Sequence, residues 1–420
     1  MKVLVVGSGA REHAIAWRLK QSHLLTDLFV APGNAGTAKI AKNLDVDIRN
    51  NVKVARAAKS LKIDLVVVGP DEPLANGMVN YLKDRNISVF GPKRKSAEME
   101  WSKSFAIEVM YSAFVPFPRS KVFYSGTDIR KFVSACSYRL VVKADGLASG
   151  KGVWLPKEKS EIIDAALKCR TNRPKEPVIL QEFLEGREVS VFCFVDGEHI
   201  SSLVAACDYK RLKDGDEGPN TGSMGSYAWP IFWTDELEKF ISEKIILPVI
   251  KELKQRGRPF VGILYAGLIL TKDGPKVLEF NARFGDSEAQ VILPLLISDP
   301  IEIMMACIEG RLEKTPVIWR KDISCVGAVM ASRGYPDPDK CESGLEIEGL
   351  DEKFNIPDSL IFHAHTKEIN ENGKIKIITG KGRVLTVVGI DKSLPGARSI
   401  AYQRLALVSF LNEHRNDIAL

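Results

Sequence analysis

The chain has 420 residues, of which 45% are hydrophobic and 27% are charged. These proportions exclude a wholly disordered or collagen-like chain, and a length of about 150 residues per domain predicts about three domains. No apolar run approaches the roughly 18 residues that a membrane-spanning helix needs. The net charge of +6 comes without the long basic blocks typical of nucleic-acid-binding proteins, so small anionic molecules are favoured as partners.

The first residues and the cysteines indicate where in the cell the protein is located. Lys2–Val6 is a short apolar run that ends at Gly7-Ser8-Gly9, whereas a secretory signal peptide carries a longer apolar region and a cleavage site. The seven cysteines are scattered and include no Cys-x-x-Cys pair, a pattern typical of free thiols in a reducing compartment. We therefore expect a cytoplasmic protein with no membrane or nucleic-acid partner.

Residues 1–101 alternate short apolar strands with amphipathic helices and predict an N-terminal domain. The expected strands are Lys2–Val6, Leu28–Ala31, Leu65–Val68 and Val89–Gly91. This alternation predicts βαβ units and an open, Rossmann-like parallel sheet. Ligands bind beyond the carboxyl ends of such strands, where this chain carries Gly7-Ser8-Gly9, Pro32–Gly36 and Gly69-Pro70-Asp71.

The first of these turns, Gly7–Glu12, is similar to a dinucleotide-binding fingerprint. Glu12 stands where the third glycine belongs, and no clear acidic residue closes the second strand, so the match is weak. Backbone amides beside a helix N-terminus still favour the binding of an anion. A tight turn that binds no ligand is the alternative interpretation. The candidate anion-binding residues of the two turns are Gly7, Gly9, Gly33, Asn34 and Gly36.

The rest of the chain predicts two further domains, 102–318 and 319–420. We divide the first into a linker with a helix (102–118), an inserted subdomain (119–185) and a larger subdomain (186–318). Its expected elements are helices Lys103–Tyr111, Asp128–Ala135 and Asp299–Glu309, strands Leu140–Lys143 and Val178–Glu182, and hairpins Val189–Val195 with Ile200–Ala205 and Tyr265–Leu270 with Lys276–Phe280. The smaller α+β end domain has expected strands Cys325–Ala331, Ser359–His365 and Arg383–Ile390 and a closing helix Pro395–Leu411.

Two lysines, Lys143 and Lys151, flank a glycine-rich turn that includes Gly150 and Gly152. A turn of this kind can close over a polyphosphate and bring point charges to a phosphoryl group. Its glycine spacing does not fit a Walker loop, and a solvated lysine turn is the plain alternative.

The run Lys276–Asn281 alternates apolar and polar residues. A strand with a period of two places Glu279 and Asn281 on one face and Leu278 and Phe280 on the other. Neighbouring hard oxygen ligands suit Mg²⁺. The planar guanidinium of Arg283 can donate two parallel hydrogen bonds to a carboxylate. An edge strand with charges on its solvated face is the alternative.

A long polar loop, 208–227, contains Asp208-Tyr209-Lys210-Arg211 and the glycine-rich run 218–225. Loops of this length without structure of their own are usually functional or disordered, and composition does not choose between the two.

The run Ile179–Glu188 is typical of a strand that leads into a turn. Its backbone could face an adenine edge, and a carboxylate there could face ribose hydroxyls.

In this order, the motifs resemble those of the phosphoribosylamine–glycine ligases (glycinamide ribonucleotide synthetases), an ATP-grasp family of purine synthesis. The similarity extends along essentially the whole chain. Its most specific part combines Asp-x-Lys-Arg…Gly-Pro-Asn-Thr-Gly, at 208–222, with Glu-Phe-Asn-x-Arg-Phe-Gly-Asp, at 279–286. The resemblance implies a pre-ATP-grasp N-terminal domain, a central ATP-grasp domain and a small C-terminal α+β domain. It also implies that ATP, glycine and 5-phosphoribosylamine react through a glycyl phosphate to ADP, phosphate and glycinamide ribonucleotide.

The resemblance implies roles for individual residues. The metal, Mg²⁺ or Mn²⁺, would bind Glu279 and Asn281. ATP would contact Lys103, Lys143, Gly150, Lys151, Gly152, Glu182, Leu184 and Glu188, the last three at the adenine and ribose. The catalytic set would be Lys151, Asp208, Lys210, Arg211 and Arg283, and the other substrates would contact Gly7, Gly9, Gly33, Asn34, Gly36, Asp71, Asn220, Gly222 and Asp286. A monomer or weak dimer is expected.

Some residues depart from the family pattern. Ser223, Ser226 and Ser287 replace a usual Gly, Ala and Pro, and Arg333 stands where a small residue is common. The segment 169–177 lacks the usual Phe-Gly-x-Ala-Gly lid. Three alternatives therefore stay open: an ATP-grasp ligase for another amino acid or amine, a catalytically weakened or non-catalytic nucleotide-binding homologue, and a nicotinamide-dependent dehydrogenase, which only the first glycine turn favours.

Overall fold

The computed structural model describes residues 1–124, 127–146, 152–172 and 176–420. An N-terminal sheet contains parallel strands in the order β3-β2-β1-β4-β5. Its strands are β1 (Lys2–Gly7), β2 (Asp27–Pro32), β3 (Lys42–Asn43), β4 (Leu65–Val68) and β5 (Val89–Phe90). The helices of this domain are α1 (Ala10–Leu19), η1 (Thr37–Lys39), α2 (Asn51–Ser60), α3 (Asp71–Ala75), α4 (Met78–Lys83) and α5 (Arg94–Trp101).

The predicted open parallel sheet is confirmed. Val3–Val6 are fully buried, as expected for a parallel strand whose two faces are covered. Strand β1 pairs with both β2 and β4, so the strand order turns at β1. Gly7, which ends β1, and Gly69, which follows β4, lie at this turning point, where doubly wound sheets bind their ligands.

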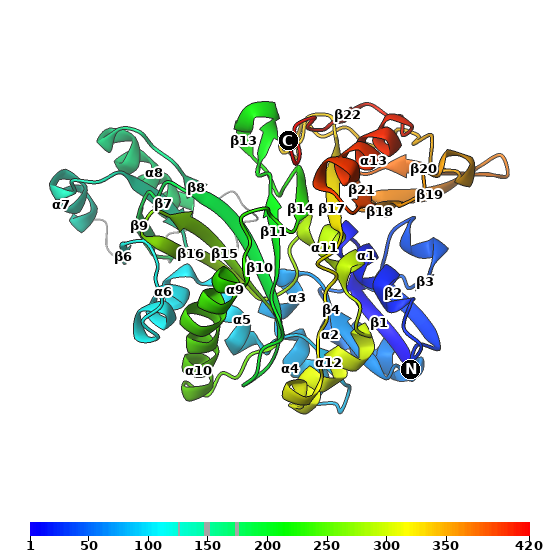
Figure 1. Cartoon of the computed structure of the whole chain (residues 1–420), viewed down its shortest axis with the longest axis horizontal. Helices are drawn as coiled ribbons and strands as arrows, with labels where there is room; N and C mark the ends of the chain where they lie inside the picture. The colour runs from blue at the N-terminus through cyan, green and yellow to red at the C-terminus, as the bar shows by residue number, and fades with distance from the viewer. Residues whose placement is uncertain (125–126, 147–151, 173–175) are drawn as a thin grey trace.

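The inserted subdomain is a four-stranded antiparallel sheet in the order β6-β9-β7-β8. It projects at the upper left of Figure 1 with helices beside it. Its elements are β6 (Ser120–Phe123), α7 (Thr127–Ala135), β7 (Leu140–Ala144), β8 (Val153–Trp154), α8 (Lys159–Asn172) and β9 (Val178–Glu182), preceded by α6 (Lys103–Ser112).

A nine-stranded sheet forms the centre of the molecule, in the order β16-β15-β10-β11-β14-β17-β21-β18 with β22 beside β17. The central domain contributes β10 (Arg187–Asp196), β11 (Val204–Asp208), β14 (Gly225–Ala228), β15 (Val261–Thr271) and β16 (Gly274–Asn281). The end domain contributes β17 (Ser324–Ser332), β18 (Ser359–His363), β21 (Arg383–Asp391) and β22 (Asn412–Glu413). The sheet therefore runs without interruption from one domain into the next (Figure 1).

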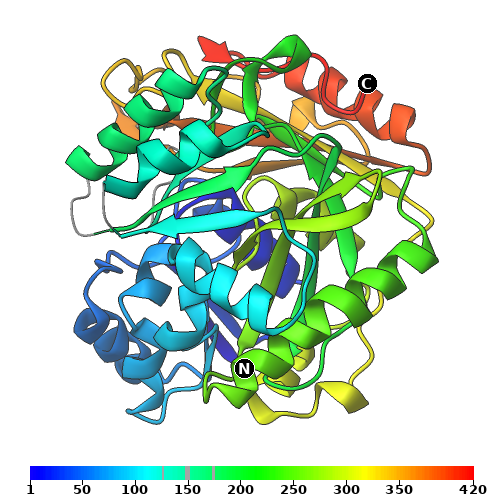
Figure 2. The same ribbon diagram turned by 90° about the vertical axis from the view of Figure 1, so that its left-hand side faces the viewer.

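Helices cover this sheet. Figure 2 shows α13 above the central strands and the N-terminal domain below them. The helical segments after β14 are α9 (Asp235–Ile241), η3 (Ser242–Ile246), α10 (Leu247–Gln255), α11 (Glu288–Ile292), η4 (Leu293–Leu295), α12 (Pro300–Glu309), η5 (Leu312–Lys314), η6 (Glu352–Phe354) and α13 (Leu394–Ala406). Among the described residues, no helix is long and apolar enough to cross a bilayer.

Three sequence expectations were wrong in detail. The closing helix ends at Ala406, because Ser409 instead forms two backbone hydrogen bonds with Glu348. The second strand of the first hairpin begins at Val204. Ile200 forms only an isolated bridge with Val195, because the Ser201 hydroxyl takes the Phe194 amide that would continue the backbone pairing. The loop 208–227 is not structureless: it contains β12 (Arg211–Lys213), η2 (Asp214–Asp216), β13 (Glu217–Asn220) and β14. The end domain also has an unpredicted hairpin, β19 (Thr366–Glu371) with β20 (Lys374–Thr379).

Candidate active site

The base of the site lies between β7 and β16. Lys143 on β7 is buried, and its Nζ donates to the Leu278 carbonyl at 3.2 Å. Gly267 pairs with Glu279 while Leu268 pairs with Val277, so Leu278 is an extra residue in β16, and such bulges re-aim groups beside active sites. This corrects the predicted alternation, because Val277 and Phe280 are buried and Leu278 is only half-buried.

A cavity opens beside this contact. Apolar residues of α5, α6, β9 and β16 line most of it, together with the polar side chains of Glu100, Lys103, Lys143, Gln181 and Glu279. Apolar walls with a few convergent charges are typical of a nucleotide pocket. Glu182 ends β9 and Leu184 lies two residues beyond it, at the edge of this region. The Glu182 carboxylate accepts a hydrogen bond from the Arg119 amide at 3.2 Å.

The charges in the cavity act on one another. Burial lowers the pKa of Lys143 to about 8, and Glu279 opposes this change. Burial acts to raise the pKa of Glu279, but Lys210, Lys143 and Lys103 outweigh it and the pKa is lowered. Glu279 is therefore ionised at neutral pH among several cations, which is an arrangement suited to a metal ion and a polyphosphate.

Glu279 and Asn281 fit a magnesium ion that arrives with a polyphosphate. They lie two residues apart on β16 and pair with Gly267 and Tyr265, so their side chains share one face, as predicted. Within the described ranges, no group of three or more His, Cys, Asp or Glu residues could hold a metal by itself. Mg²⁺ usually binds one or two protein oxygens, and water and phosphate oxygens supply its other ligands.

Arg283 is fixed by a residue that the sequence analysis missed. Its Nη2 lies 2.7 Å from Glu100 Oε1 on α5, and Glu100 also accepts from the Ala282 amide at 2.9 Å. Arg283 Nε is buried without a partner among the described residues and is a donor left for a ligand. Glu100 carries no recognisable pattern in sequence, because it acts through a contact 183 positions away in the chain.

Asp208 and Lys210 meet at the start of the loop 208–227, which we call the acceptor loop. Lys210 Nζ lies 2.6 Å from Glu188 Oε2 and 4.0 Å from Asp208 Oδ1, so the predicted ribose ligand Glu188 is held by the acceptor loop. Burial raises the pKa of Asp208 to about 7, with Lys210 opposing and Glu288 adding. Arg211 lies apart from this group: its Nη1 donates to the Gly218 carbonyl at 2.8 Å, within the hairpin that pairs Arg211 with Asn220.

Arg383 of the end domain reaches the same region and was not among the predicted site residues. Its Nη2 lies 2.9 Å from Asp286 Oδ2, and its Nη1 donates to the carbonyls of Gly222 and Asp286. One guanidinium thus joins two predicted substrate-binding residues. A lone arginine at the start of a strand gives no sequence pattern that would reveal this.

We expect Arg383→Ala to lower kcat/KM by about 10- to 100-fold, because it leaves the half-buried Asp286 carboxylate without its charged partner. Steady-state ADP release measures this change. Arg320→Ala is the matched control, since Arg320 forms an exposed ion pair with Asp322 in the same domain. Equal effects of the two substitutions would contradict a role for Arg383 in the site.

The first glycine turn encloses a carboxylate of the protein itself. Glu12 Oε2 accepts from the Gly9 amide at 2.7 Å, and a side chain at Gly7 or Gly69 would collide with Glu12. Arg11 Nη1 donates to the Phe284 carbonyl at 3.3 Å, so this turn lies against the segment that follows β16. Burial acts to lower the pKa of Arg283, but the negative charges around it, Asp71 among them, outweigh this effect and raise the pKa. Asp71 therefore lies near the Arg283 side chain.

The second glycine turn is held by Asn34. The Asn34 Oδ1 accepts from the Gly36 amide at 2.8 Å, and its Nδ2 donates to the carbonyls of Ser8 at 2.8 Å and His363 at 2.7 Å. The Gly33 amide donates to the Gly7 carbonyl at 3.2 Å. These groups join the two turns and the end domain, and their contact with a substrate stays a prediction.

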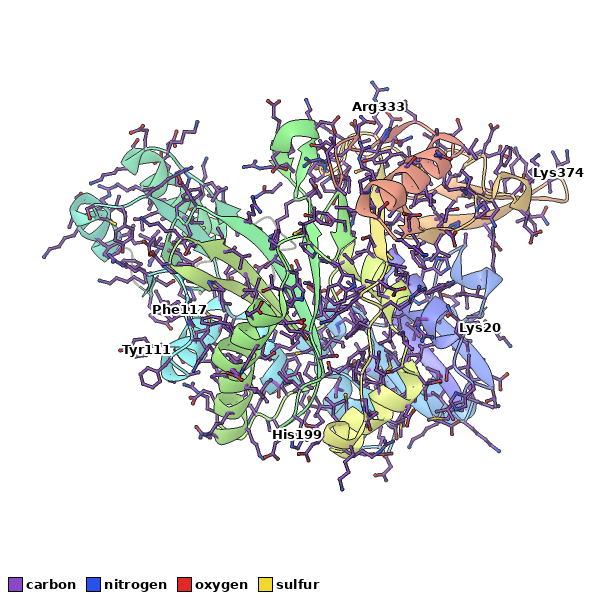
Figure 3. All side chains as sticks on the ribbon, viewed as in Figure 1. Lys20, Tyr111, Phe117, His199, Arg333 and Lys374 are labelled. Carbon is purple, nitrogen blue, oxygen red and sulfur yellow. The ribbon has the colours of Figure 1, made fainter. Side chains whose placement is uncertain are left out.

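Some predicted residues are not in these contacts. Gly150 and Lys151 lie outside the described residues, as does part of the segment 169–177. Gly152 is described, and its carbonyl accepts from the Ala144 amide at 2.8 Å. Arg333 is exposed at the outer surface of the end domain (Figure 3), so this departure from the family pattern lies away from the site.

Two sheets face each other across the buried Lys143 and the paired oxygen ligands of Glu279 and Asn281. This arrangement defines an ATP-grasp enzyme, a class that activates carboxylates with ATP. Three family models cover most of the chain: the N domain of phosphoribosylglycinamide synthetase at 1–100, its ATP-grasp (A) domain at 101–289 and its C domain at 325–420. The chain belongs to the phosphoribosylglycinamide synthetase family.

Individual relatives agree with this assignment. The chain is 43% identical to a phosphoribosylamine–glycine ligase of Caldanaerobacter subterraneus, and the match covers 100% of this chain and 99% of that protein. It is 44% identical to the chicken (Gallus gallus) trifunctional purine biosynthetic protein adenosine-3, of which it spans 42%.

Solved structures agree as well. A phosphoribosylamine–glycine ligase from Thermotoga maritima has a TM-score of 0.83 at 32% identity, with both chains fully covered. The biotin carboxylase domain of the Hydrogenobacter thermophilus 2-oxoglutarate carboxylase, solved with MgADP, has a TM-score of 0.71 at 15% identity, and the match covers 98% of this chain and 91% of that one. At this level of identity the second likeness shows the fold alone.

Proposed function

We propose that this chain joins glycine to 5-phosphoribosylamine through a glycyl phosphate, with the residues described above in separate roles. As a member of its family with relatives of the same length and name, the chain is a carbon–nitrogen ligase of purine biosynthesis. The products are glycinamide ribonucleotide, ADP and phosphate. The division of roles among the residues is our proposal.

Carboxylate activation would occur at the base of the site. Lys143 and Lys103 would hold the ATP phosphates, and the apolar cavity beside them would hold the adenine. Mg²⁺ bound by Glu279 and Asn281 would neutralise phosphate charge. Arg283, whose Nε has no partner in the described part of the chain, would orient the glycine carboxylate so that its oxygen attacks the γ-phosphorus in line.

Amide formation would occur beneath the acceptor loop. The ribosylamine nitrogen attacks the carbonyl carbon of glycyl phosphate, and phosphate leaves with the carbonyl–oxygen bond electrons. The amine must lose a proton, and Asp208 is suited to accept it because its pKa of about 7 lies near working pH. Lys210 and Asp286 would hold the acceptor, with the second glycine turn, Gly33–Gly36, at its 5-phosphate.

The observation that carries this proposal is the buried Lys143 beside the ionised Glu279, on facing sheets, in a cavity with apolar walls. A coupled ADP-release assay tests it, with ribosylamine generated in the cuvette from ammonia and ribose 5-phosphate. We expect ADP release to require both glycine and ribosylamine. Release with another amino acid instead of glycine would favour a different ATP-grasp ligase, and ATP binding without release would favour a non-catalytic homologue.

The dehydrogenase alternative loses its support in the structure, because Glu12 fills the space between Gly7 and Gly69 that a dinucleotide-binding turn leaves to the pyrophosphate. A spectral titration with a nicotinamide cofactor should therefore show no binding.

Three finer properties also belong to the proposal. Mg²⁺ is the expected metal, with Mn²⁺ as its substitute, and activity measured with each metal after chelation compares them. Light scattering should show a monomer or a weak dimer. A cytoplasmic location is expected, and fractionation of the source cells would check it.

A further inference from the structure

Three serine side chains meet where the acceptor loop passes the segment after β16. Ser223 and Ser226 belong to the acceptor loop, and Ser287 lies between Asp286 and Glu288. All three are at most 2% exposed. Ser223 Oγ lies 2.8 Å from Ser287 Oγ, and Ser226 Oγ donates to the Ser287 carbonyl at 3.1 Å. Because the three side chains are shielded from bulk solvent, these bonds help to fix the spacing of the two segments.

Ser223 has a backbone conformation that favours glycine. Its φ is +105°, and non-glycine residues at such angles persist where the surrounding structure holds them, often at functional sites. The Ser223 hydroxyl has a full set of partners, since it also donates to the Gly225 carbonyl at 3.0 Å. Glycine would remove the backbone strain, but it would also remove the hydroxyl.

The hydroxyl pair continues a path of hydrogen bonds that begins at Lys210. The Lys210 carbonyl accepts from the Thr221 amide at 2.7 Å and from its hydroxyl at 2.9 Å. Thr221 Oγ1 in turn accepts from the Ser223 amide at 3.1 Å, and Ser223 bonds to Ser287. The path thus ends beside Asp286, the residue that Arg383 holds. Lys103 and Lys143 belong to other elements, α6 and β7.

We propose that Ser223 is a positioning residue, which sets Lys210 and Asp208 relative to Asp286 through its bond to Ser287. It acts chiefly on the ribosylamine side of the reaction. The effect on ATP is smaller, because Lys210 touches, among the predicted ATP ligands, only Glu188 at the ribose, while Lys103 and Lys143 would hold the phosphates. This inference rests on the function proposed above, because it takes the acceptor loop to hold the amine substrate.

The test varies each substrate in turn in the ADP-release assay. We expect Ser223→Ala and Ser287→Ala each to raise the KM for ribosylamine about tenfold, because each leaves a buried hydroxyl without its partner. The KM for ATP should stay within about twofold. The double variant should be no worse than either single variant, since the two hydroxyls act on each other.

Two further variants separate positioning from folding. Ser223→Gly should raise the KM for ribosylamine as Ser223→Ala does, while its thermal midpoint exceeds that of Ser223→Ala because glycine relieves the backbone. Ser201→Ala is the matched control. Its buried hydroxyl accepts from one backbone amide and donates to one carbonyl at the far end of the β10–β11 hairpin, and we expect wild-type KM values.

The outcomes distinguish this inference from the proposed function. An unchanged KM for ribosylamine in Ser223→Ala and Ser287→Ala, with an active wild type, overturns the inference alone. So does an equal rise in the KM for ATP, or the same rise in Ser201→Ala, because either would be a general structural effect. A wild type whose ADP release needs no ribosylamine overturns the proposed function itself.

Discussion

Glu279→Gln should lower kcat by about 100- to 1,000-fold, the usual effect of removing a charged group that stabilises the transition state. The substitution keeps the shape of the side chain but removes the charge that Lys210, Lys143 and Lys103 surround. Three cations would then face one another without their common anion, and Mg²⁺ would lose its only charged protein ligand in the pair Glu279 and Asn281. Initial rates of ADP release across a magnesium titration measure both effects.

The control for Glu279 is Glu368→Gln, because Glu368 is exposed on β19, and β19 lies at the opposite end of the molecule from β7 and β16 (Figure 1). We expect this variant to have the wild-type rate and magnesium dependence. Circular dichroism should show both variants folded. A folded Glu279→Gln enzyme with a normal rate at low magnesium would remove Glu279 from the site.

Lys143→Ala should weaken ATP binding and lower turnover by about 100-fold, because the variant loses a buried positive charge that faces the phosphates. The effect should depend on pH. Burial lowers the pKa of Lys143 to about 8, so the side chain is charged below pH 8 and loses its charge as pH rises. In the wild type, the affinity for ATP should therefore fall as pH rises through about 8.

Lys143→Arg separates charge from other effects of pH, because a guanidinium stays protonated throughout this range. Its affinity for ATP should be almost independent of pH between 7 and about 9.5, as measured by equilibrium titration with MgATP. Lys121→Ala is the control, since Lys121 is exposed on β6 of the same four-stranded sheet. A pH dependence that persists unchanged in Lys143→Arg would assign the titrating group elsewhere.

Local patterns were sufficient to predict the N-terminal sheet and the strand that carries Glu279. Buried parallel strands are continuous apolar runs, and Val3–Val6 and Leu65–Val68 are such runs. The polar alternation at Glu279 and Asn281 also survives in the structure, because the bulge at Leu278 precedes both residues. In these segments, the local sequence and the tertiary structure favour the same backbone.

Most of the missed features depend on contacts between distant parts of the chain, whereas β12–β13 and β19–β20 are local hairpins. Glu100 and Arg383 reach the site from α5 and β21, and neither has a local motif. The closing helix has helix-forming residues beyond Ala406, but the pairing of Ser409 with Glu348 competes with its continuation. The strands β12 to β14 lie in a glycine-rich run whose composition indicates a loop. Tertiary pairing overrides propensity in such segments.

The nine-stranded sheet limits how the chain can be shortened. Gly225–Ala228 pair with Cys325–Ala328 across the boundary between the central and end domains. A protein cut between residues 310 and 324 would keep Lys143 and Glu279, yet it would present a row of unsatisfied amides and carbonyls along β14, a template for self-association. A minimal catalytic fragment of this enzyme would therefore precipitate unless the missing strands were supplied as a separate polypeptide.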